Sequence, residues 1–211
     1  MKAILWDNDG VLVDTERFYF DASRETLARF GVVFDEPTYV DHCLRHGASC
    51  FDLLRSRGVG EAAVAAARAG RDARYEELIA EVELIPGVRE TLESLHGRVP
   101  MAVVTSSQPH HFDLQHARTG AHRFFEFVLT AADYTHHKPD PEPYLLAASR
   151  LGIPPEDCLA VEDTERGLAA ATRAGMRCAV IPRWLSAGGN FASAWRVLPE
   201  VRRVPELFAD W

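Results

Sequence analysis

The chain has 211 residues, enough for one ordinary core or a core with a modest insertion. Its hydrophobic fraction of 47% excludes wholesale disorder, and its net charge of −8 argues against a protein that tracks nucleic-acid phosphates. No apolar run approaches the roughly 20 residues needed to cross a bilayer, and the four cysteines form no CxxC pair. We therefore expect a cytoplasmic, monomeric protein with reduced thiols that binds neither nucleic acid nor membranes.

Short apolar runs predict buried parallel strands, because each is hydrophobic on both faces. These runs are Ala3–Trp6, Met101–Val104, Phe127–Leu129, Cys158–Val161 and Cys178–Ile181. Helical spacing of apolar residues lies between them, at 88–95, 144–151 and 168–174. Alternating strands and helices predict an α/β fold with a doubly wound parallel sheet, in which ligands bind at the carboxyl ends of the strands.

The segment between the first two predicted strands is too long for a single crossover. Residues 15–84 contain helical patterns and no convincing strand, with candidate helices at 19–30, 36–45, 50–57 and 61–80. We interpret residues 15–84 as an α-helical cap inserted into a core made of residues 1–14 and 85–211.

Acidic side chains follow two of the predicted strands. Asp7 and Asp9 flank Asn8 directly after the first strand, and Glu162 and Asp163 follow the fourth. A turn rich in Asp, Asn and Gly, or helix capping, would explain either segment alone. Together they form an oxygen-lined site suited to Mg²⁺, because neighbouring carboxylates repel unless a cation or a proton is shared.

Hydroxyl groups and one lysine complete the candidate site. Thr105 and Ser106 follow the second strand, where hydroxyl and backbone N–H groups could hold phosphate oxygens, although an ordinary loop has the same composition. Lys138 is one of only two lysines and lies beside Pro139, which suggests an ammonium group held in place rather than a solvated side chain.

In order and spacing, these four segments resemble the motifs of the haloacid dehalogenase-like superfamily. Residues 7–16 are similar to its first motif, Thr105 to its second, Lys138 with Pro139 and Pro141 to its third, and Glu162-Asp163 to its fourth. The inserted cap is similar to that of the subgroup containing β-phosphoglucomutase and many sugar-phosphate phosphatases.

The resemblance implies a role for each residue. Asp7 would be the nucleophile that forms an aspartyl phosphate, and Asp9 the general acid and base. Mg²⁺ would be held by the Asp7 carboxylate, the Asp9 main-chain carbonyl and Asp163, with Glu162 close by or acting through water. The phosphoryl oxygens would be held by Thr105, Ser106 and Lys138.

Departures from the family patterns reduce the number of reaction types that we expect for this protein. Asp9 disfavours dehalogenation, and the absence of any lysine between Lys2 and Lys138 leaves no candidate for Schiff-base chemistry in the cap. Mutase relatives carry a cap histidine and a cap-loop arginine where this chain has Tyr19 and Cys50, which favours hydrolysis.

Substrate specificity is expected to reside in the cap. Arg45, His46 and Ser49 occupy the predicted loop facing the catalytic cleft, and Arg45 could bind an anionic group. Exposed helix-end residues are the alternative interpretation of the same segment.

The sequence therefore predicts a Mg²⁺-dependent phosphomonoesterase acting on a small phosphorylated metabolite, a sugar or polyol phosphate. A phosphosugar mutase is the alternative enzyme. A non-catalytic binding protein on the same fold is the alternative of another class, and the presence of Asp7, Asp9 and Asp163 argues against it.

Overall fold

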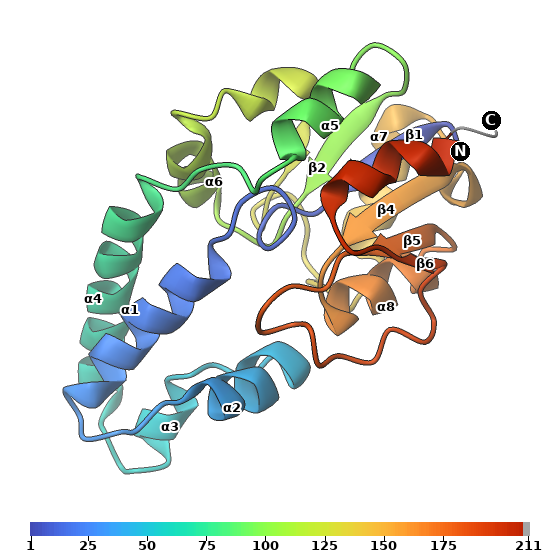
Figure 1. Ribbon diagram of the computed structural model, residues 1–211. Helices are drawn as coiled ribbons and strands as arrows, with labels where there is room; N and C mark the ends of the chain where they lie inside the picture. Colours follow the sequence, from blue (N-terminus) through green and yellow to red (C-terminus); the bar gives the residue numbers. More distant parts are fainter. Residues whose placement is uncertain (209–211) are drawn as a thin grey trace. The chain divides into compact units, whose positions relative to one another are not determined.

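The computed structural model describes residues 1–208, which form two compact units (Figure 1). The first unit comprises Met1–Asp14 and the chain from Glu83 onward, and the second comprises Thr15–Val82. The first unit carries the sheet, and the second is helical.

The first unit is built on a parallel sheet of six strands in the order β3-β2-β1-β4-β5-β6. Leu5, at the centre of the sheet, pairs with Ala102 on one side and Ala160 on the other. Chain order therefore reverses beside β1, and ligands of open α/β sheets bind at such switch points. The predicted doubly wound parallel sheet is confirmed. The strands are β1 (Ala3–Trp6), β2 (Met101–Val104), β3 (Val128–Leu129), β4 (Cys158–Glu162), β5 (Arg177–Val180) and β6 (Arg196–Val197).

Two helical layers cover the sheet because successive strand residues point to opposite faces. Ile4 and Trp6 of β1 belong to a core cluster that includes residues of α5 (Val88–Leu95) and Phe112 of α6 (Pro109–His116). Ala3 and Leu5 belong to a second cluster, with α7 (Glu142–Leu151) and α8 (Glu165–Arg173). Both faces of the central strands are therefore apolar and buried.

One strand and one α-helix of the first unit were not predicted. The edge strand β6 has two exposed residues and so lacks any apolar run. Helix α6 buries Phe112 beside two polar residues, Gln115 and His116, so an apolar helical stripe is missing from its sequence.

The second unit is a set of helices around its own aromatic core. Its helices are α1 (Glu16–Ala28), α2 (Glu36–Tyr39), α3 (Asp52–Arg55) and α4 (Glu61–Ile79), and α1 packs along α4. The predicted helix at 36–45 begins at the Asp35 cap, whose carboxylate accepts the Thr38 N–H at 3.0 Å. It continues past Tyr39 as a π-helical turn, Val40–Arg45.

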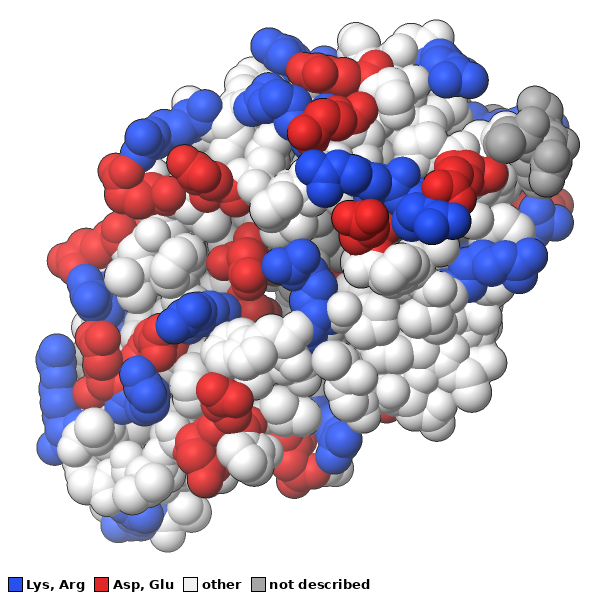
Figure 2. All heavy atoms as spheres, viewed as in Figure 1, with Lys and Arg blue, Asp and Glu red and all other residues white. Residues whose placement is uncertain are grey.

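The surface of the described residues carries charged side chains of both signs. On the face shown in Figure 2, arginine and lysine side chains are interspersed with aspartate and glutamate. Within residues 1–208, none of the helices combines the length and the apolar character that a bilayer crossing requires. All four cysteines are free thiols, as predicted.

Candidate active site

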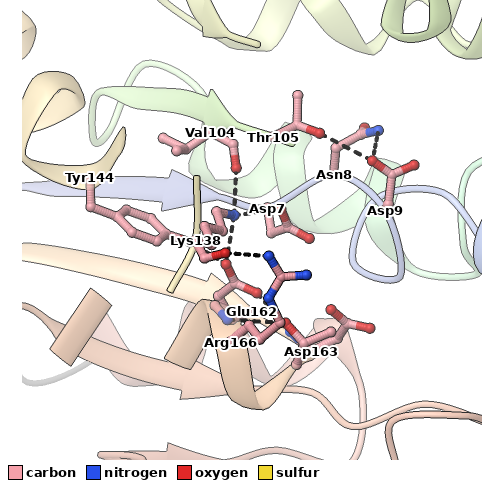
Figure 3. A network of polar contacts seen from close by, with 12 residues as sticks. Asp7, Asn8, Asp9, Val104, Thr105, Lys138, Tyr144, Glu162, Asp163 and Arg166 are labelled. Atoms are coloured by element: carbon pink, nitrogen blue, oxygen red, sulfur yellow. Dashed lines mark hydrogen bonds and ion pairs between the residues drawn. The ribbon is translucent and has the colours of Figure 1, made fainter. Parts of the chain in front are cut away.

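The carboxyl ends of three adjacent strands deliver most of the predicted site residues to one edge of the sheet (Figure 3). Asp7 follows β1, Thr105 follows β2, and Glu162 ends β4 with Asp163 after it. Lys138 comes from the loop before α7. Parallel pairing of β1 with β2 and β4 is what gathers residues far apart in the sequence.

Lys138 is the centre of a buried charge network. Its Nζ donates to Asp7 Oδ1 at 2.7 Å, to Glu162 Oε1 at 2.7 Å and to the Val104 carbonyl at 2.8 Å. The side chain is 5% exposed. Tyr144, on α7, donates its hydroxyl to Glu162 Oε1 at 2.6 Å. All three ammonium hydrogens of Lys138 therefore have acceptors, and the ammonium group is held in place, as its position beside Pro139 suggested.

The same network shifts the protonation of its members. Burial, and next the charge of Glu162, raise the pKa of Asp7 well above its ordinary value, against the opposing effect of Lys138. Burial alone would lower the pKa of Lys138, but the Asp7 and Glu162 carboxylates outweigh it and raise that pKa. Lys138 is consequently a permanent cation at the site.

Glycines allow two of the carboxylates to approach the backbone. Gly10 has φ +85°, and a Cβ placed there would lie 2.2 Å from Asp163 Oδ2. A Cβ at Gly167 would lie 1.9 Å from the Glu162 carboxyl carbon. Any side chain at either position would displace a carboxylate, so glycine is required at both. The neighbouring Arg166 donates to the Lys138 carbonyl and ties that loop to α8.

The donor set fits a hard divalent cation. Asp7, Glu162 and Asp163 each offer a carboxylate oxygen, and these atoms lie within 4.8 Å of one another. Mg²⁺ prefers such oxygen ligands, and the space beside Gly10 seats Asp163 against the turn that follows Asp7. The residues present therefore fit Mg²⁺.

Asp9 lies next to Thr105 (Figure 3). Its Oδ2 accepts the hydroxyls of Thr105 at 3.1 Å and Ser107 at 2.7 Å, and its Oδ1 accepts Gln115 Nε2 at 3.1 Å. Thr105 is fully buried, whereas Ser106 is exposed. Ser107 and Gln115 were not identified from sequence. The run of hydroxyl residues after β2 extends to Ser107 and is a signal that could have found it, whereas no pattern in the sequence marks Gln115.

His116 lies behind this turn in a buried position. Burial lowers its pKa to about 4, against a raising effect of Asp9 and with a smaller lowering effect of His122. Its Nε2 lies 2.8 Å from Asn8 Oδ1, and its Nδ1 lies 2.8 Å from Thr119 Oγ1. The imidazole is therefore neutral in the folded protein at neutral pH.

The low pKa of His116 predicts a loss of stability in mild acid. The unfolded chain binds its proton near the ordinary value of 6.5 but the folded chain only near 4, so stability is complete above 6.5 and falls between the two values. We expect the free energy of unfolding to drop by about 3 kcal/mol across this window because of His116 alone.

Urea denaturation of the wild type and of His116→Gln at several pH values measures this effect. The variant should show the smaller decrease of stability with acidification, and equal decreases in the two proteins would contradict the prediction.

The predicted specificity residues belong to the second unit. Arg45 ends the π-helical turn, and the exposed His46 follows it with Nδ1 2.6 Å from the Asp41 carbonyl. Ser49 Oγ accepts the Phe51 N–H at 3.3 Å and an Arg68 guanidinium N–H at 3.4 Å. Their roles in specificity stay predictions.

Sequence reasoning did not identify a buried arginine in the second unit. Arg71 on α4 is 4% exposed, and its guanidinium lies 4.2 Å from the centroid of the Tyr19 ring. In the sequence it stands among alanines and charged residues of one helix, so nothing there marks it as buried.

Residues 4–181 match the haloacid dehalogenase-like hydrolase family. The chain belongs to this family. Within the family, it is 31% identical over 226 residues to protein CbbY of Rhodobacter capsulatus, covering 98% of this chain and 99% of that protein. It is 33% identical over 177 residues to fructose-1-phosphate phosphatase YqaB of Escherichia coli K12, covering 82% of this chain and 92% of that protein.

Solved structures of the family share the fold. A crystal structure of a CbbY mutant from Rhodobacter sphaeroides, in complex with xylulose-(1,5)bisphosphate, superposes with a TM-score of 0.81 at 26% identity. The match covers 97% of this chain and 96% of that one. The predicted haloacid dehalogenase-like family is confirmed, and the matching family model is that of a hydrolase.

Proposed function

We propose that the protein is a Mg²⁺-dependent phosphomonoesterase that hydrolyses a sugar or polyol phosphate through an aspartyl phosphate on Asp7. The observation that carries the proposal is a cluster of carboxylates at the carboxyl ends of the parallel strands, formed by Asp7, Glu162 and Asp163. The buried Lys138 ammonium contacts two of them, Asp7 and Glu162. The names of the relatives support the substrate class, since YqaB is a fructose-1-phosphate phosphatase and CbbY was crystallised with a sugar bisphosphate.

In the first step, a carboxylate oxygen of Asp7 attacks phosphorus and the bond from phosphorus to the sugar oxygen breaks. Asp9 gives its proton to the departing alkoxide, which leaves as an alcohol. In the second step Asp9 takes a proton from water while the water oxygen attacks phosphorus. The P–O bond to Asp7 breaks, inorganic phosphate is released, and the free Asp7 carboxylate is regenerated.

The remaining residues stabilise charge and hold the phosphoryl group. Asp7, Asp163 and the Asp9 carbonyl would hold Mg²⁺, with Glu162 nearby, and the ion would supply positive charge to offset the repulsion between phosphate and carboxylates. Lys138 supplies a second fixed charge, and Thr105 and Ser106 offer hydroxyls to the phosphoryl oxygens. A cytoplasmic location, expected from composition, and a monomeric state complete the proposal.

Metal removal tests the proposed function. We expect EDTA to lower phosphate release from p-nitrophenyl phosphate and from a panel of sugar phosphates by about 100-fold or more, because the charge that screens the carboxylates is lost. Excess Mg²⁺ should restore it. Turnover that is undiminished after metal removal, or the absence of phosphate release from every substrate, would contradict the proposal.

A further inference from the structure

A chain of buried polar side chains lies behind the turn that carries Asp9. Asn8, Gln115, His116 and Thr119 are between 0% and 8% exposed. Asn8 follows β1, whereas the other three belong to α6 or the turn after it. Apolar residues are the usual occupants of such positions, and buried polar groups require complete hydrogen bonding. Hydrogen bonds that link these four side chains to one another contribute to meeting that requirement.

The direction of its hydrogen bonds can be followed from Thr119. The Thr119 hydroxyl oxygen accepts the Ala121 N–H at 3.2 Å and lies 2.8 Å from His116 Nδ1. In the neutral imidazole one nitrogen donates and the other accepts. His116 Nε2 faces the Asn8 side-chain oxygen at 2.8 Å, which can only accept. Nε2 therefore carries the hydrogen, and Nδ1 accepts the Thr119 hydroxyl.

The two amides have the orientations that this tautomer requires. With its oxygen bound to His116, Asn8 turns its NH₂ group to Gln115 Oε1 at 2.6 Å and to Asp9 Oδ2 at 3.3 Å. Gln115 then has its own NH₂ group facing Asp9 Oδ1 at 3.1 Å. Reversing the Asn8 amide would place its oxygen against Gln115 Oε1, and reversing the Gln115 amide would place its oxygen against Asp9 Oδ1. The orientation of each amide therefore depends on that of its neighbour.

We infer that His116, through Asn8 and Gln115, is a positioning residue that holds the Asp9 carboxylate in one place for proton transfer. The inference rests on the proposed function, in which Asp9 is the general acid and base. Two amide N–H donors of this network reach Asp9, one at Oδ2 and one at Oδ1, and the Thr105 and Ser107 hydroxyls also donate to Oδ2.

Leaving-group dependence separates positioning of Asp9 from a general loss of structure. An alkoxide leaving from a sugar phosphate needs a proton in the first step, whereas nitrophenolate leaves without one. Loss of His116 should therefore slow the first step selectively for the alkyl substrate. A merely structural defect would slow both substrates alike.

The test is a single-turnover measurement with enzyme in excess, comparing release of the alcohol from a hexose phosphate and from p-nitrophenyl phosphate. For His116→Leu we expect the hexose rate to fall about 10- to 100-fold and the nitrophenyl rate to change less than about 3-fold. His116→Gln, which keeps an N–H donor for Asn8, should restore most of the hexose rate. His96→Leu, which replaces an exposed histidine directly after α5, is the matched control and should leave both rates unchanged.

Equal losses on both substrates, or no loss in a folded His116→Leu variant, would overturn the inference. If that variant does not fold, Thr119→Val carries the same test with nearly unchanged volume. Nitrogen-15 NMR of the wild type gives a readout without turnover, since the hydrogen must reside on Nε2 of His116; the Nδ1–H tautomer would also overturn it. A wild type that releases no phosphate from either substrate would defeat the proposed function instead.

Discussion

Replacing Asp7 by asparagine is expected to abolish phosphate release, lowering kcat by about 10⁴-fold or more, while leaving the protein folded. The amide has the same shape but cannot form the covalent intermediate. Because burial and the neighbouring Glu162 charge raise the pKa of Asp7, its ionised form is held in the folded state at some cost. The neutral amide removes that cost, so we expect the melting temperature to stay equal or rise.

Phosphate release, thermal denaturation and mass spectrometry of trapped wild-type enzyme measure this result together. A covalent phosphate should be found on the peptide containing Asp7 and be missing from the variant. Asp113→Asn, an exposed aspartate of α6, is the control for removal of one negative charge. Turnover by Asp7→Asn at the wild-type rate would rule out the aspartyl phosphate.

Replacing Lys138 by methionine is expected to damage stability and activity together. The change leaves Asp7 and Glu162, which are 8% and 1% exposed, without the ammonium that lies 2.7 Å from each. Removing one partner of a buried ion pair costs about 3–5 kcal/mol, because the other charge stays buried and uncompensated. Loss of the fixed charge beside the reacting phosphoryl group should lower kcat by about 100-fold or more.

A second substitution can show that charge, and not volume, causes this destabilisation. In the double variant Lys138→Met/Glu162→Gln the carboxylate excess is reduced, so urea denaturation should recover much of the lost stability. Acidification should also reduce the difference in unfolding free energy between the Lys138→Met variant and wild type. Asp7, whose pKa is already raised, becomes protonated, and its charge disappears. A single variant as stable as wild type at neutral pH, or a double variant no better than the single one, would contradict the electrostatic explanation.

Asp7→Asn and Lys138→Met remove opposite charges that lie 2.7 Å apart. We expect Lys138→Met to lower the stability of the protein and Asp7→Asn to leave it unchanged or raise it. The site contains more negative than positive charge when no metal is bound, because one ammonium serves two buried carboxylates. Adding Mg²⁺ should therefore stabilise wild type by mass action.

The sheet could be predicted from sequence because its central strands are apolar on both faces. Runs such as Met101–Val104 and Cys158–Val161 are too short and too hydrophobic for anything but buried strands between helices. Strand order was not accessible in this way, since the neighbours of β1 are set by how the helices pack. The two-residue edge strand β6 pairs through its backbone and leaves no mark in its side chains.

Most of the candidate site could also be predicted, for one physical reason. Asp7, Thr105, Glu162 and Asp163 stand immediately after or at the end of such runs, and parallel strands bring their carboxyl ends to a common edge. Lys138 could be identified because the chain has only two lysines and this one is followed by Pro139 and Pro141.

The sequence by itself determined which chemical groups reach the edge of the sheet, because they are attached to strands whose direction is common. Only the tertiary structure decided what surrounds them. Asn8 and Gln115 are 107 residues apart, and their contact depends on which face of α6 meets the end of β1. The contact of Tyr144 with Glu162 likewise depends on the rotation of α7 against β4. Helix packing sets such rotations through the volumes of many side chains at once, and no local pattern of residues encodes them.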